Sequence, residues 1–290
     1  SVIADALRHY APDGEALNGD GAEIDGKGAD AWIDAMVAAL KAMPNVQLRK
    51  RCQGFGVYDH GYVLLDETLT DHVPNMAGPR HRMWKVRARQ IVTATGAIER
   101  PLSFAGNDLP GVMLASAVRD YVVNYAVAPG ERTVIVTNND DAYRTALVLH
   151  EAGLKVPVIL DARAEVTGPL AEAVRALGIR ITPGRGIAGV DGGKGVARVY
   201  VCDQNGTGEV IEEVDADCVA MSGGWSPVVH LWSHCGGKLV WNPDEAHFRP
   251  DPEKAPTGAA GEAFLRTAGA ASGAVTTAVT LSDAWGAGQA

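Results

Sequence analysis

Hydrophobic residues alternate with polar residues in two different periods along the first hundred positions. Apolar side chains recur about four positions apart between Trp32 and Leu40, which predicts an amphipathic helix. The apolar runs 55–58 and 62–65 flank an Asp-His-Gly turn, which predicts a hairpin, and a third run follows at 83–86. The pattern therefore indicates one helix followed by a small antiparallel meander.

After residue 130 the pattern changes to short apolar runs that alternate with helical segments. The run 134–136 precedes a helical pattern over 143–151, and a second apolar run at 156–160 follows Gly153. A further helix is predicted near 169–177. This order of elements is typical of an α/β fold with a parallel sheet.

The run Ile91–Pro101 reads IVTATGAIERP and combines an apolar strand with an Ala-Thr-Gly turn. Gly96 has no Cβ, so backbone at this turn can approach a bulky ligand at the carboxyl end of a strand. The alternative interpretation is an ordinary strand followed by a glycine turn.

Five blocks of the sequence share a resemblance to one family. They are 58–62 (YDHGY), 70–72 (TDH), 97–119, 137–146 (TNNDDAYRTA) and 222–231 (SGGWSPVVHL). Together they resemble the α subunit of heterotetrameric sarcosine oxidase. The resemblance implies a two-dinucleotide-binding, FAD/NAD(P)-binding Rossmann-like α/β fold with a small antiparallel meander. Neither the glycine-rich βαβ unit nor the folate-binding domain of that family is visible here.

The resemblance also implies an activity and a set of partners. Sarcosine oxidase demethylates sarcosine at FAD on its β subunit and passes electrons through FMN at the α/β interface to oxygen. The products are glycine, hydrogen peroxide and a one-carbon unit on tetrahydrofolate, and γ and δ subunits complete the complex. The resemblance implies that NAD lies on this subunit, and we expect this chain to carry no amine-oxidising residue. The alternatives are the α subunit of a related opine, proline or cyanide-forming amine dehydrogenase, and a structural subunit with an empty slot.

The cofactor prediction depends on the segment 263–277. Flavin-binding relatives carry Asp after the glycine of this segment, whereas here Ala270 follows Gly269, so no acceptor for a ribityl chain is present. A helix that begins near Ser272 would still present free N–H groups to a phosphate. This combination favours NAD over FAD; the alternative is an alanine-rich core helix. The expected cofactor-binding residues are Gly54, Thr95, Gly96, Gly269, Ala270, Val275 and Thr277.

The second βαβ unit lacks the glycines that a pyrophosphate site requires. Its first turn reads Thr137-Asn-Asn-Asp-Asp141, and two carboxylates would repel an anionic ligand. We interpret Asp140 and Asp141 as helix-capping residues, and Asp161 as a carboxylate at a strand end. This half is therefore predicted to have lost nucleotide binding.

These patterns give a domain prediction. Residues 1–130 and 235–290 are expected to form the first, NAD-binding domain, without its N-terminal βαβ unit, because no glycine-rich turn precedes Ala31. Residues 131–234 are expected to form a second, degenerate Rossmann-like domain. Ser226 and Pro227 predict the start of a helix near the end of this second domain.

Composition and charge narrow the classes of partner. A net charge of −9 and a pI near 5.4 argue against binding to nucleic acid or to an anionic membrane. The apolar stretch 268–279 is too short to span a bilayer. Four scattered cysteines without a Cys-x-x-Cys pair, and no secretory signal, favour a cytoplasmic protein. His230, His234 and Cys235 have a spacing compatible with zinc, but no second ligand cluster accompanies them, so no metal site is expected.

Overall fold

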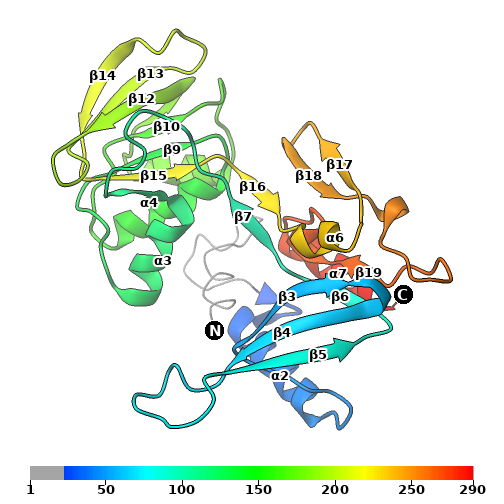
Figure 1. The fold of residues 1–290 in the computed structure, drawn as a ribbon. Helices are drawn as coiled ribbons and strands as arrows, with labels where there is room; N and C mark the ends of the chain where they lie inside the picture. The colour runs from blue at the N-terminus through cyan, green and yellow to red at the C-terminus, as the bar shows by residue number, and fades with distance from the viewer. Residues whose placement is uncertain (1–22, 290) are drawn as a thin grey trace. The chain divides into compact units, whose positions relative to one another are not determined.

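The chain folds into two compact units, and the computed structural model describes residues 23–289 of it (Figure 1). Unit 1 comprises the residues up to Trp32 and Glu99–Gly224, and unit 2 comprises Ile33–Ile98 and Trp225–Ala290. Each unit has its own sheets and its own hydrophobic core. No helix within residues 23–289 is both long and apolar enough to span a membrane.

A five-stranded parallel sheet forms the centre of unit 1, with strand order β11-β10-β9-β15-β8. Its strands are β8 (Val112–Leu114), β9 (Thr133–Thr137), β10 (Ile159–Asp161), β11 (Ile181–Pro183) and β15 (Cys218–Ser222). The helices of this unit are α3 (Ala115–Tyr125), α4 (Asp141–Glu151) and α5 (Pro169–Ala176). A short ladder of β1 (Glu23–Ile24) and β2 (Lys27–Gly28) precedes them.

The two faces of this parallel sheet bury different side chains. On one face, Ile135 of β9 packs with residues of α3, α4 and α5. On the other face, Val134 and Val136 pack against an antiparallel sheet of β12 (Arg185–Asp191), β13 (Arg198–Asp203) and β14 (Val210–Asp215). Because β9 is covered on both faces, its central run is continuously apolar, as parallel strands generally are.

Unit 2 contains the antiparallel meander predicted from the sequence. Strands β3 (Cys52–Tyr58), β4 (Tyr62–Thr68) and β5 (His81–Arg87) pair in that order, and the turn η2 (Asp59–Gly61) joins the first two. Helix α2 (Ala29–Ala42) precedes the meander. Parallel and antiparallel sheets in one α/β chain confirm the predicted fold class.

The second sheet of unit 2 is a short parallel pair. Strand β6 (Ile91–Thr93) pairs with β19 (Leu265–Thr267), so residues far apart in sequence lie side by side. Helix α6 (His230–His234) packs against both β19 and β3 and contributes Trp232 to the core of this unit. The remaining elements are β7 (Ala97–Glu99), β16 (Trp225–Pro227), β17 (Leu239–Asn242), β18 (His247–Pro250), η3 (Pro252–Lys254), η4 (Gly269–Ala271) and α7 (Thr277–Gln289).

Two helix starts expected from the sequence are wrong. Pro227 ends strand β16, which pairs with β7, and helix α6 begins only at His230. No helix begins near Ser272, because a 3₁₀ turn covers Gly269–Ala271 and α7 begins at Thr277. In both places a capping signal is present, but the local backbone is used for strand pairing or for a tight turn.

The bounds of the two units also differ from the expected domains. Most of the predicted second domain, residues 131–234, lies in unit 1. Strand β8 and helix α3 also lie in unit 1, although they were expected in the first domain, because β8 pairs with β15 at the edge of the parallel sheet. The segment 225–234, expected in the second domain, lies in unit 2. The assignment of one domain to NAD and of the other to a degenerate site stays a prediction.

Candidate functional site

Two glycine turns lie together at one edge of the parallel pair in unit 2. Strands β6 and β19 run in register, with Thr93 opposite Thr267, and the amide of Ala268 donates to the carbonyl of Thr93 over 2.9 Å. The turn at Thr95 and Gly96 follows β6, and the turn that begins at Gly269 follows β19. Both turns therefore leave the carboxyl ends of neighbouring parallel strands, which is the edge where open α/β sheets bind ligands.

The backbone of Gly96 has a conformation that favours glycine. Its φ is +77°, and a Cβ built on it would meet nothing within 4 Å. The Gly96 carbonyl accepts the amide of Val228 over 2.9 Å, and Thr95 Oγ1 donates to the carbonyl of Val228 over 2.9 Å. Segment 95–96 is thus fixed on one side by hydrogen bonds while the Cα of Gly96 faces open space, as close backbone approach to a ligand requires.

The turn after β19 is held by a carboxylate from α7. Gly269 also has a left-handed backbone, with φ of +68°. Its amide donates to Asp283 Oδ2 over 2.7 Å, and Ser272 Oγ donates to the same oxygen over 2.7 Å. The sequence predicts no acid at this turn from position 270, and the acid comes from helix α7 instead. A usable signal was present, since Asp283 is the one acidic residue after Glu262.

The other expected binding residues occupy varied positions. Ala270 lies in the 3₁₀ turn, Thr277 is the first residue of α7, and Val275 between them is 61% exposed. Gly54 lies on β3, opposite Leu65 of β4. The structure thus groups six of the seven residues at or beside the two turns, and Gly54 lies in the neighbouring meander.

A cavity of about 760 Å³ lies beside the Gly269 turn, within unit 2. Its walls come from α6, the β17–β18 hairpin, β19 and α7, and they include Ser272 and Asp283. None of the seven expected binding residues lines it. The volume lies in the range of small-molecule sites.

The described residues fit a dinucleotide in part. Gly96 provides open backbone at the carboxyl edge of the sheet, which a bulky cofactor requires. The Gly269 amide is already bound to Asp283, so this turn offers an anion fewer free donors than a helix N-terminus does. A carboxylate at this place would repel a phosphate, and the turn therefore suits an uncharged part of a ligand.

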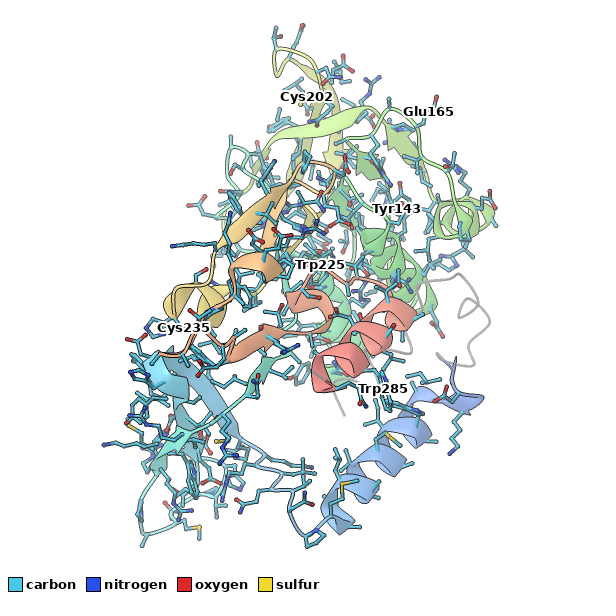
Figure 2. All side chains as sticks on the ribbon, turned by 90° about the vertical axis from the view of Figure 1, so that its right-hand side faces the viewer. Tyr143, Glu165, Cys202, Trp225, Cys235 and Trp285 are labelled. Atoms are coloured by element: carbon cyan, nitrogen blue, oxygen red, sulfur yellow. The ribbon has the colours of Figure 1, made fainter. Side chains whose placement is uncertain are left out.

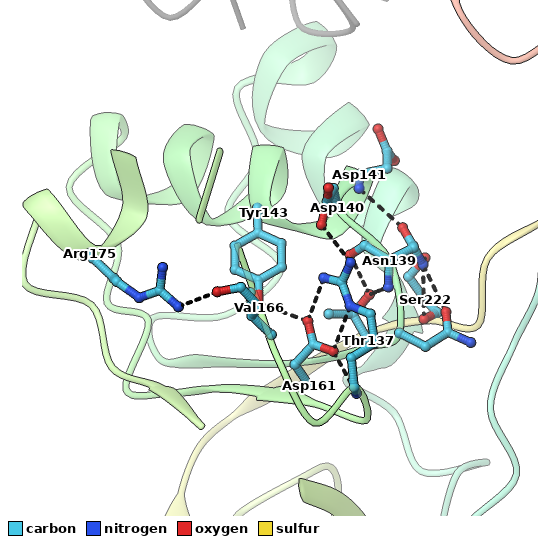
Figure 3. A network of polar contacts seen from close by, with 11 residues as sticks. Thr137, Asn139, Asp140, Asp141, Tyr143, Asp161, Val166, Arg175 and Ser222 are labelled. Carbon is cyan, nitrogen blue, oxygen red and sulfur yellow. Dashed lines mark hydrogen bonds and ion pairs between the residues drawn. The ribbon is translucent and has the colours of Figure 1, made fainter. Parts of the chain in front are cut away.

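At the carboxyl ends of β9 and β10 in unit 1, the chain's own side chains bind one another in a network of polar contacts (Figure 3). Arg163 binds Asp161 through Nε and Nη2, at 3.0 and 2.7 Å, and its Nη1 lies 2.8 Å from Asp140 Oδ1. The buried hydroxyl of Tyr143 donates to Asp161 Oδ2 over 2.8 Å. Burial beside this carboxylate raises the pKa of Tyr143, which keeps the phenol protonated and donating.

These contacts correct the interpretation of the two aspartates as capping residues. Asp140 occupies the N-cap position of α4, but its side chain makes no capping hydrogen bond and pairs with Arg163 instead. Asp141 pairs with the buried Arg119 at 3.1 Å. The amide of Asp141 donates to Asn139 Oδ1 over 3.1 Å, so Asn139 provides the local cap.

A buried acid, Glu99, lies three positions after Gly96. It is 3% exposed, and its Oε2 accepts the amide of Ser116 at 2.9 Å and the Ser116 hydroxyl at 2.6 Å. Helix α3 begins at Ala115 without a capping side chain of its own, so Glu99 supplies an acceptor to its first turn. Oε1 of Glu99 is buried without a hydrogen-bond partner among the described residues, and burial raises the pKa of this carboxyl.

The histidine and cysteine cluster considered for zinc has other contacts. The ring of His234 packs edge-on against Tyr58, at 4.8 Å between ring centres, and Cys235 Sγ donates to the carbonyl of Leu231 at 3.2 Å. No group of three or more histidine, cysteine, aspartate or glutamate side chains with metal-binding geometry exists in the part of the chain that the structure describes.

Comparison with known proteins identifies relatives along most of the chain. It is 40% identical over 276 residues to sarcosine oxidase subunit alpha of Corynebacterium sp. (strain P-1), covering 93% of this chain and 28% of the relative. The subunit alpha of Rhizobium meliloti (strain 1021) is 39% identical over 237 residues, covering 81% and 23%. The predicted resemblance to this family is confirmed, and the chain spans about a quarter of the length of these curated relatives. No model of a protein family matches the chain.

Solved structures share the fold at low sequence identity. Thioredoxin reductase of T. acidophilum superimposes with a TM-score of 0.62 at 16% identity, covering 98% of this chain and 84% of that protein. L-proline dehydrogenase of P. horikoshii gives a TM-score of 0.59 at 22% identity, covering 92% and 47%. These similarities support the predicted two-dinucleotide-binding α/β fold.

Proposed function

We propose that this chain is a region of the α subunit of a sarcosine oxidase-like complex, in which unit 2 binds NAD. The complex would oxidatively demethylate sarcosine to glycine and transfer the one-carbon unit to tetrahydrofolate, with hydrogen peroxide as the second product. FAD would lie on the β subunit and FMN at the α/β interface. The chain's own role would be retention of NAD and support of the flavin-bearing partner, together with γ and δ subunits.

The observation that carries this proposal is the pair of turns at the carboxyl edge of β6 and β19. Gly96 combines a left-handed backbone with open space at its Cα, and the second glycine turn lies on the adjacent strand. Open α/β sheets bind dinucleotides at this edge. The relatives with up to 40% identity are named as α subunits of one oxidoreductase, which supports the enzyme class.

Each residue has a defined part in this proposal. Gly96 admits the ligand to the backbone, and Thr95 fixes the turn through Val228 rather than through the ligand. Asp283 holds the Gly269 turn and directs an uncharged part of the cofactor toward it. NAD, when bound, supplies a nicotinamide ring that accepts hydride.

The preference for NAD over FAD in this chain follows from position 270. Ala270 follows Gly269 and carries no acceptor for a ribityl chain, and the one carboxylate at the turn, Asp283, is already engaged with Gly269 and Ser272. In unit 1, the Arg163 network occupies the carboxyl ends of β9 and β10 in the second βαβ unit. Within residues 23–289, neither unit then offers a flavin site.

A competition experiment tests this function. The purified chain is incubated with equal amounts of NAD and FAD, separated from free nucleotide, and denatured, and the released cofactor is identified by mass and absorbance. We expect NAD and no flavin, and a colourless protein before denaturation. Stoichiometric release of FAD would contradict the proposal.

A further inference from the structure

Strand β5 forms an uncovered edge of the meander in unit 2. The strand order of this sheet is β3-β4-β5, and within residues 23–289 strand β5 pairs with β4 alone. The other edge strand, β3, packs against helix α6, whose end at Cys235 lies beside the meander in Figure 2. In this part of the chain, the seven residues of β5 therefore have one row of main-chain groups without a partner strand.

Hydrogen bonds at the two ends of β5 show which residues face the open edge. The carbonyl of Arg80 accepts the amide of Leu69 over 2.8 Å. At the other end, the amide of Ala88 donates to the carbonyl of Gly61 over 2.9 Å. In an antiparallel pair, every second residue directs its main-chain N–H and C=O groups toward the partner strand, so the even-numbered residues of β5 bind β4. The residues whose main-chain groups face the open edge are His81, Met83, Lys85 and Arg87.

Positive charge is concentrated around this edge. Residues 49–89 contain eight of the 26 Lys and Arg residues but only four of the 35 Asp and Glu residues, although the whole chain has a net charge of −9. Segment 80–89, which includes β5, contains five of these cations and no acid. A positive surface on an otherwise acidic protein favours an anionic partner.

The cations on the exposed face of β5 have no acidic partner among residues 23–289. Lys85 lies opposite Leu64 of β4. Arg87 lies opposite Tyr62 and stacks over its ring, with 5.1 Å between the guanidinium carbon and the ring centre. The Nη1 atom of Arg87 donates to the carbonyl of His60 over 3.2 Å, which leaves its charge uncompensated. The same lack of an acidic partner holds for the two flanking arginines, Arg80 and Arg89.

The charge on an edge strand determines which strands it can accept. Two copies of the chain that met β5 to β5 would place these cations against one another, so the charge guards the edge against pairing with itself. A strand of opposite charge meets no such repulsion. The open edge and its cations together therefore suit an acidic strand from a different polypeptide.

We propose that β5 docks an extended acidic segment of another polypeptide, which adds a fourth strand to the meander. The main chain of this segment binds the open N–H and C=O groups of β5, and its acidic side chains, at every second position, face Lys85 and Arg87. Apolar side chains at the positions between them lie beside Trp84 and Val86 on the other face. A membrane or a nucleic acid supplies negative charge but no strand of main-chain groups. The inference holds whether or not this chain binds NAD.

Peptides as long as β5 test this docking. The 290-residue chain is titrated calorimetrically, at low ionic strength, with acetyl-EVEVEVE-amide, whose two faces match those of β5. Acetyl-EVEPEVE-amide has the same charge, but its proline removes one N–H group and disfavours a strand. Acetyl-KVKVKVK-amide reverses the charge. We expect the first peptide to bind at least about tenfold more tightly than either control.

Two results with these peptides would overturn the proposal. Equal binding of the two acidic peptides would mean that the edge attracts anions without pairing with a strand. No binding of acetyl-EVEVEVE-amide would mean that the cations of β5 only guard the edge.

Substitutions at Met83 separate the main chain of β5 from its charge. Met83→Pro removes an N–H group that points away from β4, so the ladder to β4 and every charge stay in place. This variant is expected to bind acetyl-EVEVEVE-amide about tenfold or more weakly. Met83→Ala removes the same side chain, which is 59% exposed, but keeps the N–H group, and should change affinity less than about threefold. Equal affinities in the two variants, with folding verified by circular dichroism, would contradict strand addition.

A charge substitution locates the binding without changing the main chain. Lys85→Gln removes one uncompensated cation and is expected to weaken the binding of acetyl-EVEVEVE-amide about threefold or more. Lys194→Gln makes the same change at an exposed lysine of unit 1 and should change affinity less than about twofold. Equal weakening by both would show an effect of net charge alone and would overturn the proposal. Binding of the chain to phosphatidylserine vesicles that is lost in Lys85→Gln but kept in Met83→Pro would assign the edge to a membrane instead.

Discussion

Arg163 and Asp161 form a two-point ion pair in which the carboxylate has no exposed surface. Nε and Nη2 of Arg163 lie 3.0 and 2.7 Å from the two oxygens of Asp161, at the carboxyl end of β10. The pair lies where a dinucleotide-binding unit would place the ribose of its ligand. Arg163 thus binds the carboxylate oxygens of Asp161 to which the ribose of a cofactor would otherwise donate.

Arg163→Met should lower the free energy of unfolding by about 3 kcal/mol, because it leaves a buried carboxylate without its cation. The matched control is Arg180→Met, which breaks an exposed pair with Glu212 and should cost at most about 1 kcal/mol. Urea unfolding followed by circular dichroism measures both. Equal losses in the two variants would show that the Arg163 pair has no special importance.

Glu99→Gln should change how stability depends on pH. Burial raises the pKa of Glu99 above its ordinary value of 4.5, so the folded state binds this proton more tightly than the unfolded state does. Protonated Glu99 therefore contributes to the stability of the folded state. This contribution is complete below pH 4.5 and is lost as pH rises through the raised pKa of Glu99. Glutamine does not ionise, so it removes this loss, and its carbonyl oxygen can still accept from Ser116. The variant should therefore gain stability relative to the unmodified chain as pH rises from 5 toward about 8.

Glu212→Gln provides a control of opposite sign. The hydrogen bond from Arg180 lowers the pKa of Glu212. Ionised Glu212 therefore contributes to the stability of the folded state above its ordinary pKa, and this contribution is lost as pH falls through the lowered pKa. This variant should lose stability relative to the unmodified chain at neutral pH and regain it in acid. Urea unfolding at several pH values checks both slopes, and parallel curves for Glu99→Gln and the unmodified chain would refute the role of burial.

Asp283→Ala should release the Gly269 turn. The substitution removes the acceptor for the Gly269 amide and for the Ser272 hydroxyl, at a cost of about 2 kcal/mol. Hydrogen exchange of the Gly269 amide is expected to accelerate at least about tenfold, whereas Ser282→Ala, one position earlier on α7, should leave it unchanged. Unchanged exchange in Asp283→Ala would show that another group protects this amide.

Local patterns predicted the strands that carry the proposed site. The apolar run before Gly96 forms β6, and the absence of glycines at 138–141 correctly indicated a turn that side chains fill. These features depend on a few neighbouring residues, and so the sequence displays them directly. The sequence prediction also grouped this run with residues 235–290 in one domain, and in the structure β6 pairs with β19 from that segment.

Long-range contacts account for what the sequence did not reveal. Asp140 has the local signature of a capping residue, but Arg163, brought near by the pairing of β9 with β10, takes its carboxylate. Asp283 reaches the Gly269 turn only because α7 folds back beside it. A partner that is set by tertiary packing is not encoded in the spacing of residues on either segment.

The direct test of the proposed NAD site is calorimetric titration of NAD into three forms of the chain: unmodified, Gly96→Val and Gly153→Val. Both glycines have nearly the same backbone, with φ of +77° and +76°, and a Cβ at either meets nothing within 4 Å. The two variants should therefore lose similar stability, but only Gly96→Val places a branched side chain where the cofactor approaches. We predict that the unmodified chain and Gly153→Val bind NAD with equal affinity and that Gly96→Val binds at least about tenfold more weakly. Equal affinity in all three forms, or no binding by the unmodified chain at millimolar NAD, would contradict the account.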